Sequence, residues 1–240
     1  MRRESMRALN VSLIVCALAC GAASARSLAA QNPAIQEKVA EVKAAAAANK
    51  QALAQYTWVE TDTISLKGEE KKQEHFQVRL GPDGKPQKTP LDAAAPSEPS
   101  GGRLKRHIVE KKVDEYKEYA DQIKALIQQY LPPDRDAIGQ AYQKDNVMVG
   151  PAPGGPGQYK AVISNYVKQG DKMTLVMDAA QKNIVSLSIA SYLDDPSDAV
   201  TVEAQFVPIP GGPNHVSSQT INGVKKQLTI AVQNANYQKL

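Results

Sequence analysis

The stretch KMTLVMDAAQKNIVSLSIAS, residues 172–191, decides the fold of this chain. Met173, Leu175 and Met177 alternate with other residues, and Leu187 and Ile189 alternate with serines after a short break at 179–183. Alternation with a period of two indicates a strand with one apolar face, and so short a connection indicates antiparallel neighbours. The stretch therefore predicts two paired strands that share an apolar face.

The same alternation continues on both sides of this stretch. We expect six strands in the second half of the chain, at Tyr159–Val167, Lys172–Asp178, Ile184–Ser191, Ala199–Val207, His215–Ile221 and Lys225–Val232. The connections between them are short, and Asn222-Gly223 is a hairpin signal. Before them, the Gly- and Pro-rich residues 150–157 predict an irregular crossing.

A shorter group of strands is expected at 57–91. Residues 57–66 are rich in β-branched side chains, residues 75–80 alternate, and Asp83-Gly84 marks a turn toward a third short strand. Residues 92–102 contain prolines, serines and glycines without periodicity, which predicts a flexible linker.

Helical spacing appears in two regions. Residues 33–55 predict a helix with a thin apolar face, although an alanine-rich linker is the alternative. The clearest helix lies within 103–144, where apolar residues recur at steps of four and three before Pro132-Pro133: Val109, Val113, Tyr116, Ala120, Ile123, Ile127 and Tyr130. This spacing also suits a coiled-coil dimer, but tyrosines and an alanine in the seam favour packing on a sheet. A shorter helix is expected at 134–144.

The first 25 residues have the three parts of a secretory signal peptide. Three arginines are followed by an apolar run at 8–22 and by Ala23-Ser24-Ala25. We therefore expect export to the periplasm. Both cysteines of the chain, Cys16 and Cys20, lie in this segment, so cleavage removes the thiols. Lipidation at Cys20 is the less favoured alternative.

The remainder, residues 26–240, suits one domain. Removal of Arg2, Arg3, Arg7 and Glu4 lowers the net charge from +4 to +2, which disfavours nucleic-acid binding. The predicted fold class is α+β, mainly antiparallel β. Because about nine strands with one apolar face must curl and be covered, we expect a curved, incomplete β-barrel with two or three helices on its concave face.

No catalytic or metal-binding pattern stands out. His75, His107 and His215 are far apart and lack ligand spacing. Asp194, Asp195 and Asp198 surround a proline, which favours a solvated turn over a calcium loop. Glu60 and Asp62 share one strand face and are as easily a polar rim as an acid–base pair. We expect no cofactor, no metal and no enzymatic activity.

The apolar face supplies the candidate ligand-lining residues. Methionine is soft and adaptable, so Met173 and Met177 could line a site for an acyl chain, although ordinary core beneath the helix is the alternative. The full candidate set is Trp58, Tyr116, Ile123, Met173, Leu175, Met177, Leu187, Ile189 and Phe206.

The order of these features resembles the lipoprotein-carrier family, with its LolA/LolB-like fold. A signal peptide, an N-terminal helix, strands that begin at Tyr56-Thr57-Trp58, an inserted helical segment and six hairpin strands follow in that order. The resemblance implies a half-barrel that holds an acyl chain or another apolar ligand beneath its helices.

Two functions follow as expectations. The first is a periplasmic, non-enzymatic carrier of a hydrophobic small molecule or lipoprotein; the alternative is an envelope protein-interaction module with a filled core and no ligand. A hydrolase is a third hypothesis, with only its compartment to support it. We expect a monomer, no nucleic-acid partner, and membrane contact that is peripheral at most.

Overall fold

A computed structural model describes residues 44–92, 103–131 and 133–240 of the chain. The signal peptide with Cys20, the start of the helix expected at 33–55 and most of the linker expected at 92–102 lie outside the described residues.

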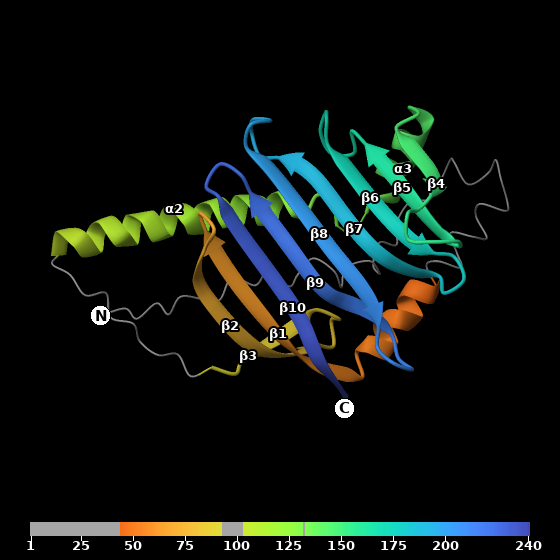
Figure 1. The fold of residues 1–240 in the computed structure, drawn as a ribbon, viewed down its shortest axis with the longest axis horizontal. Helices are drawn as coiled ribbons and strands as arrows, with labels where there is room; N and C mark the ends of the chain where they lie inside the picture. Colours follow the sequence, from red (N-terminus) through yellow and green to blue (C-terminus); the bar gives the residue numbers. More distant parts are fainter. Residues whose placement is uncertain (1–43, 93–102, 132) are drawn as a thin grey trace.

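The described strands form a single antiparallel sheet, drawn in Figure 1. Its order is β3-β2-β1-β10-β9-β8-β7-β6-β5-β4, and β3 and β4 are the two edges, so the sheet is open. The strands are β1 (Tyr56–Leu66), β2 (Glu69–Leu80), β3 (Pro86–Pro90), β4 (Val147–Pro151), β5 (Gln158–Ser164), β6 (Lys172–Asp178), β7 (Asn183–Tyr192), β8 (Ala199–Pro208), β9 (Asn214–Gly223) and β10 (Leu228–Lys239).

The antiparallel α+β class is confirmed, but the count of about nine strands is corrected to ten. The additional strand is β4, whose five residues end in Gly150-Pro151. Those two residues were assigned to an irregular crossing because glycine and proline usually interrupt strands. Proline is tolerated here because β4 lies at the edge of the sheet. An edge strand can lack an N–H on its outer side without losing a hydrogen bond to its neighbouring strand.

The last strand of the chain lies in the middle of the sheet. β10 pairs with β9 on one side and with β1 on the other, so that Thr57 lies opposite Gln238. The register shifts between Thr57 and Val59, where β10 contains one additional residue. Asn236 has a φ of 56° in this bulge, a conformation that asparagine tolerates better than most residues.

Helix α2 (Arg103–Ile127) crosses one face of the sheet, which we call the concave face (Figure 1). Within the predicted helical seam, Ala120, Ile123, Ile127 and Tyr130 are buried as expected, and the last of these lies just beyond the helix. Val113 is 39% exposed, contrary to its predicted core position. The ribbon of α2 begins beyond the strands, which agrees with the exposure of Val113 (Figure 1).

Helix α2 approaches the sheet closely at Gly223, where β9 ends. A Cβ atom at Gly223 would lie 2.6 Å from Tyr119 Cε1 and 2.7 Å from Ile123 Cδ1. Cβ atoms in proteins essentially never lie within 3.0 Å of such a neighbour. Glycine at this position therefore allows the helix to rest directly on the strand.

Two further helices complete the described structure. A helix at 44–53 lies before β1, and α3 (Arg135–Gln143) lies before β4. The main core joins α2 and the region around α3 to the strands between β5 and β10. A second, smaller core contains Trp58, Phe76, Val78 and Leu80, packed with Leu53 and Tyr237.

Candidate functional site

A single row of side chains crosses the concave face. The register places directly opposed residues on the same face of a sheet. From one side of the sheet to the other, the row is Asp62, Val232, Gln219, Ala204, Leu187, Leu175, Ala161 and Val149. Its first five members are buried, whereas Leu175 and Ala161 are half-buried and Val149 is 68% exposed. The concave face is thus covered at one side and open at the other.

Helix α2 and the turn after it are fixed to the strand loops by two tyrosines. The Tyr119 hydroxyl donates to Asp198 Oδ1 at 2.5 Å, in the loop between β7 and β8. The Tyr130 hydroxyl lies 2.5 Å from Asp171 Oδ2 and 2.7 Å from Ser191 Oγ. Burial, and then the neighbouring carboxylate, raise the pKa of both tyrosines, so both hydroxyls keep their protons and donate.

Asp171 also organises its own loop. Its carboxylate accepts backbone N–H groups from Tyr166 at 2.6 Å and from Val167 and Lys168 at 2.8 Å. A buried carboxylate requires such donors, and here they hold the connection between β5 and β6 against Tyr130. The helix cover of the concave face therefore has polar anchors in addition to its apolar contacts.

The structure divides the predicted ligand-lining residues into four groups. Ile123, Met173, Leu187 and Ile189 lie in the main core, and Leu175 and Phe206 pack against it half-buried. Trp58 belongs to the smaller core. Tyr116 is half-buried at the rim, where Lys226 Nζ lies 5.5 Å from its ring centroid. Met177 is 37% exposed, so it lies beyond the cover.

The open side of the concave face carries apolar side chains. Tyr159 lies opposite Met177 and is 48% exposed, and Val149 lies one strand further out. Half-buried Ala161 and Leu175 connect them to the core. We call Val149, Tyr159, Ala161, Leu175 and Met177 the concave patch. Val149 is absent from the predicted set because β4 was not predicted, and Tyr159 was predicted in a strand but not as a site residue.

A buried ionic cluster occupies the covered side of the same face. Lys88 on β3 bridges Glu60 and Asp62 on β1, with Lys88 Nζ 2.9 Å from Asp62 Oδ2. All three side chains are at most 7% exposed, so the expectation of a polar rim is wrong. Burial is the main cause that raises the pKa of Asp62 to about 7; Lys88 opposes the increase and Glu60 adds to it.

The cluster lies near a row of aromatic rings. Tyr237 stacks on Trp58 at 5.4 Å and also contacts His215 at 4.0 Å, centroid to centroid. Trp58 Nε1 donates to Asn234 Oδ1 at 3.0 Å. Burial lowers the pKa of His215 to about 4, so the ring is neutral near pH 7. His215 is therefore buried and packs against Tyr237, rather than lying at the surface as the scattered histidines were expected to do.

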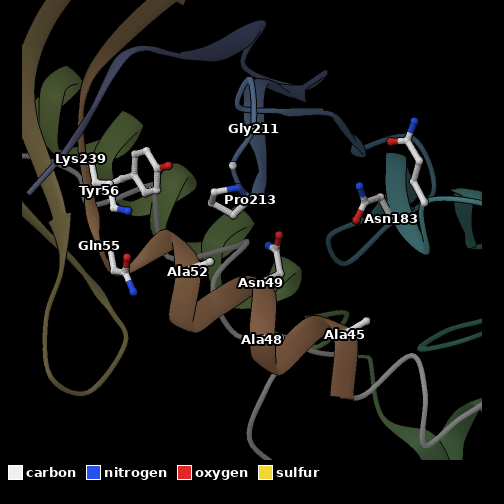
Figure 2. Close-up of a pocket in the computed structure, with 12 residues that line it drawn as sticks. Ala45, Ala48, Asn49, Ala52, Gln55, Tyr56, Asn183, Gly211, Pro213 and Lys239 are labelled. Atoms are coloured by element: carbon white, nitrogen blue, oxygen red, sulfur yellow. The ribbon is translucent and has the colours of Figure 1, made fainter.

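A groove lies beside the helix at 44–53, shown in Figure 2. This groove has a volume of about 460 Å³ and lies open to solvent. Its lining combines small residues with amides, among them Ala45, Ala48, Asn49, Gln181 and Asn183. Asn49 donates to the Asn214 carbonyl at 2.8 Å and accepts from the Asn214 N–H at 2.7 Å, which attaches the helix to β9.

The aspartates after β7 form a turn. Asp195 accepts the Ser197 N–H at 2.8 Å, and Asp198 accepts a hydrogen bond from the Tyr119 hydroxyl.

Within 44–92, 103–131 and 133–240, no three His, Cys, Asp or Glu side chains lie close enough together to hold a metal ion. Among these same residues, no helix combines the length and apolarity that crossing a membrane requires.

Comparison with known proteins finds no counterpart. No protein-family model, curated protein or solved structure matches this chain.

Proposed function

We propose that this protein is a non-enzymatic, exported binder or carrier of a hydrophobic ligand, similar to the lipoprotein-carrier family. The observation that carries the proposal is the concave patch. Val149, Tyr159 and Met177 expose apolar surface on the same face of the sheet as the core. Contiguous apolar surface on a curved face is favourable for a ligand with an acyl chain, because binding removes that surface from water.

The chemistry of the patch supports an adaptable site. Methionine and leucine side chains change rotamer easily and fit chains of varied shape. Tyr159 adds a ring with a polar end, which suits the boundary between an apolar ligand and water. Ala161 between Val149 and Leu175 leaves room above the sheet.

The direct test is binding of a long-chain fatty acid or of an environment-sensitive apolar dye. The wild-type chain is expected to enhance dye fluorescence and to release acyl material on extraction, detected by mass spectrometry. Met177→Asp places a charge in the patch and is expected to abolish the enhancement with little loss of stability, since Met177 is 37% exposed. Val224→Asp is the control, because Val224 is 54% exposed in the β9–β10 hairpin and away from the patch.

Two results would contradict the proposal. A wild-type protein that neither enhances the dye nor carries lipid has no such site. Equal binding by wild type and Met177→Asp would place the ligand elsewhere in the molecule.

An envelope protein-interaction module is the second candidate. It is favoured by the tight packing of Met173, Leu187 and Ile189 against Ile123, which fills the covered side of the concave face. Under this function the wild-type chain binds neither dye nor fatty acid, whereas Met177→Asp abolishes capture of a protein partner that Val224→Asp retains.

A further inference from the structure

The two edges of the sheet differ in the backbone groups that they present. In an antiparallel strand, successive residues direct their N–H and C=O groups to opposite sides. On β4, Asn146 O accepts from Ser164 N at 2.8 Å, and Ala152 N donates to Gln158 O at 2.9 Å. Even-numbered residues therefore face β5. It follows that Val147, Val149 and Pro151 direct their backbone groups outward. Among the described residues, neither the Val147 N–H nor the Val149 N–H has a backbone hydrogen-bond partner outside the ladder.

The opposite edge is nearly without outward donors. Gly81 N donates to Lys85 O at 2.8 Å, and Leu91 N donates to His75 O at 2.9 Å, so odd-numbered residues face β2. The outward residues of β3 are then Pro86, Lys88 and Pro90. Two of these are prolines, which have no N–H, and this is a common way to prevent a sheet edge from pairing.

The side chains of β4 also differ from those of a protected edge. Met148 is 67% exposed and Val149 is 68% exposed, and they lie on opposite faces of the strand. No charged residue occurs within Val147–Pro151. An exposed edge with apolar side chains and outward-facing backbone donors favours pairing with another strand.

We propose that β4 pairs antiparallel with β4 of a second copy of this chain, about a two-fold axis at Val149. In this register the two Val149 residues exchange N–H···O=C hydrogen bonds, and each Val147 N–H donates to the Pro151 carbonyl of the other copy. The missing N–H of Pro151 costs one hydrogen bond at each end.

The side chains fit the same register. Met148 of one copy lies opposite Gly150 of the other, and no atom lies within 4 Å of the position that a Cβ on Gly150 would occupy. The exposed Met148 side chain can therefore lie over this open space. The two Val149 side chains lie beside each other on the concave face, so the concave patches of the two copies become continuous.

A second copy is favoured over an unrelated strand because the edge is self-complementary. A two-fold interface uses the same residues on both copies and closes the assembly. The prolines of β3 then stop growth at two chains, which also avoids edge-to-edge aggregation. This dimer departs from the monomer expected from sequence, and it does not depend on ligand binding.

The test is the mass of the purified chain by analytical ultracentrifugation over a wide concentration range. The wild type is expected to reach the mass of two chains. Val149→Lys places two positive charges opposite each other at the axis and is expected to give the mass of one chain. Val224→Lys is the matched control and is expected to remain dimeric.

A third variant tests the register. Gly150→Leu is tolerated within one chain because the space beside Gly150 is open, but it removes the space for Met148 of the partner copy. We expect it to weaken the dimer without lowering the midpoint of denaturant unfolding, measured at concentrations where the chain is monomeric. A wild type that stays monomeric, a dimeric Val149→Lys, an unaffected Gly150→Leu or a wild-type assembly larger than two chains would each overturn the proposal.

Discussion

Met173 and Met177 lie four residues apart on one strand and on one face, yet their surroundings differ. Met173 is fully buried between Ile163 and Ile189 beneath α2, whereas Met177 is 37% exposed beside Tyr159. The alternation along β6 is the same at both positions. The difference lies in the cover, because α2 crosses only one side of the concave face (Figure 1). The face of a residue and its burial are therefore separate properties.

The largest effect is expected from truncating these two methionines. Met173→Ala should lower the free energy of unfolding by about 2 to 5 kcal/mol, because it leaves a cavity in a closed core. Met177→Ala should lower it by less than about 0.5 kcal/mol, because solvent already reaches the side chain. Urea unfolding of both variants measures the contrast, and equal losses would show that the two sites are covered alike.

The comparison of buried and exposed side chains also applies to ionisable groups, beginning with the buried carboxylate of Asp62. The pKa of Asp62 is raised from 3.8 to about 7, so the folded protein holds a proton that the unfolded chain releases. The contribution of Asp62 to stability is then greatest at low pH and falls as the pH rises from about 4 to 7, by roughly 2 to 4 kcal/mol. Asp62→Asn should remove this fall, which thermal unfolding between about pH 4 and 8 would detect.

Asp92 provides the control for this measurement. It is exposed, and its hydrogen bonds from His75 lower its pKa, which is the opposite direction. Asp92→Asn should therefore follow the wild-type pH profile above pH 4. Because His215 changes stability in the opposite direction over the same range, Asp62 is tested by the difference in stability between wild type and Asp62→Asn at each pH. A difference that stays constant from pH 4 to 7 would contradict a raised pKa at Asp62.

His215 is expected to show the reverse pH dependence. Its pKa is lowered from 6.5 to about 4, so the unfolded chain takes up a proton more readily than the folded one. Its contribution is present above pH 6.5 and is lost as the pH falls toward 4, by roughly 2 kcal/mol at pH 5. His215→Phe keeps a ring against Tyr237 and should reduce this loss. The free energy of unfolding of both proteins is measured by chemical denaturation as the pH falls from 6.5 to 4. An equal loss in wild type and His215→Phe would contradict this role of His215.

The smallest of these effects concerns the anchors of the cover. Tyr130→Phe removes a hydroxyl that contacts Asp171 and Ser191, and should lower the free energy of unfolding by about 1 to 2 kcal/mol. Tyr142→Phe is the control, since Tyr142 is 67% exposed. Equal stability of the two variants would show that apolar packing alone holds the cover in place.

Much of the fold was predictable because hairpin strands follow each other in sequence. The six strands expected after residue 158 are present, and their short connections gave the correct antiparallel order. The position of β10 between β1 and β9 was not predictable, because no local pattern indicates pairing between distant segments. β4 was missed because three apolar residues before Gly150 are too few to show alternation.

The candidate site was predicted in part. Alternation correctly assigned Met173, Leu175 and Met177 to one face, but it contained no information about where α2 would end. The buried ionic cluster was missed for a similar reason. Lys88 follows a turn between two prolines, a context typical of exposed loops, and only the pairing of β3 with β2 brings it to Glu60.

The central position of β10 has a consequence for the order of folding. Residues of β1 leave the ribosome or a translocation channel long before their β10 partners. The β1–β3 meander is therefore exposed for a time without β10 beside it. The β5–β9 hairpins contact only strands that are near in sequence and can form earlier. We therefore expect β10 to insert late, between two parts that have already formed, so that residues 228–239 join the two halves of the sheet.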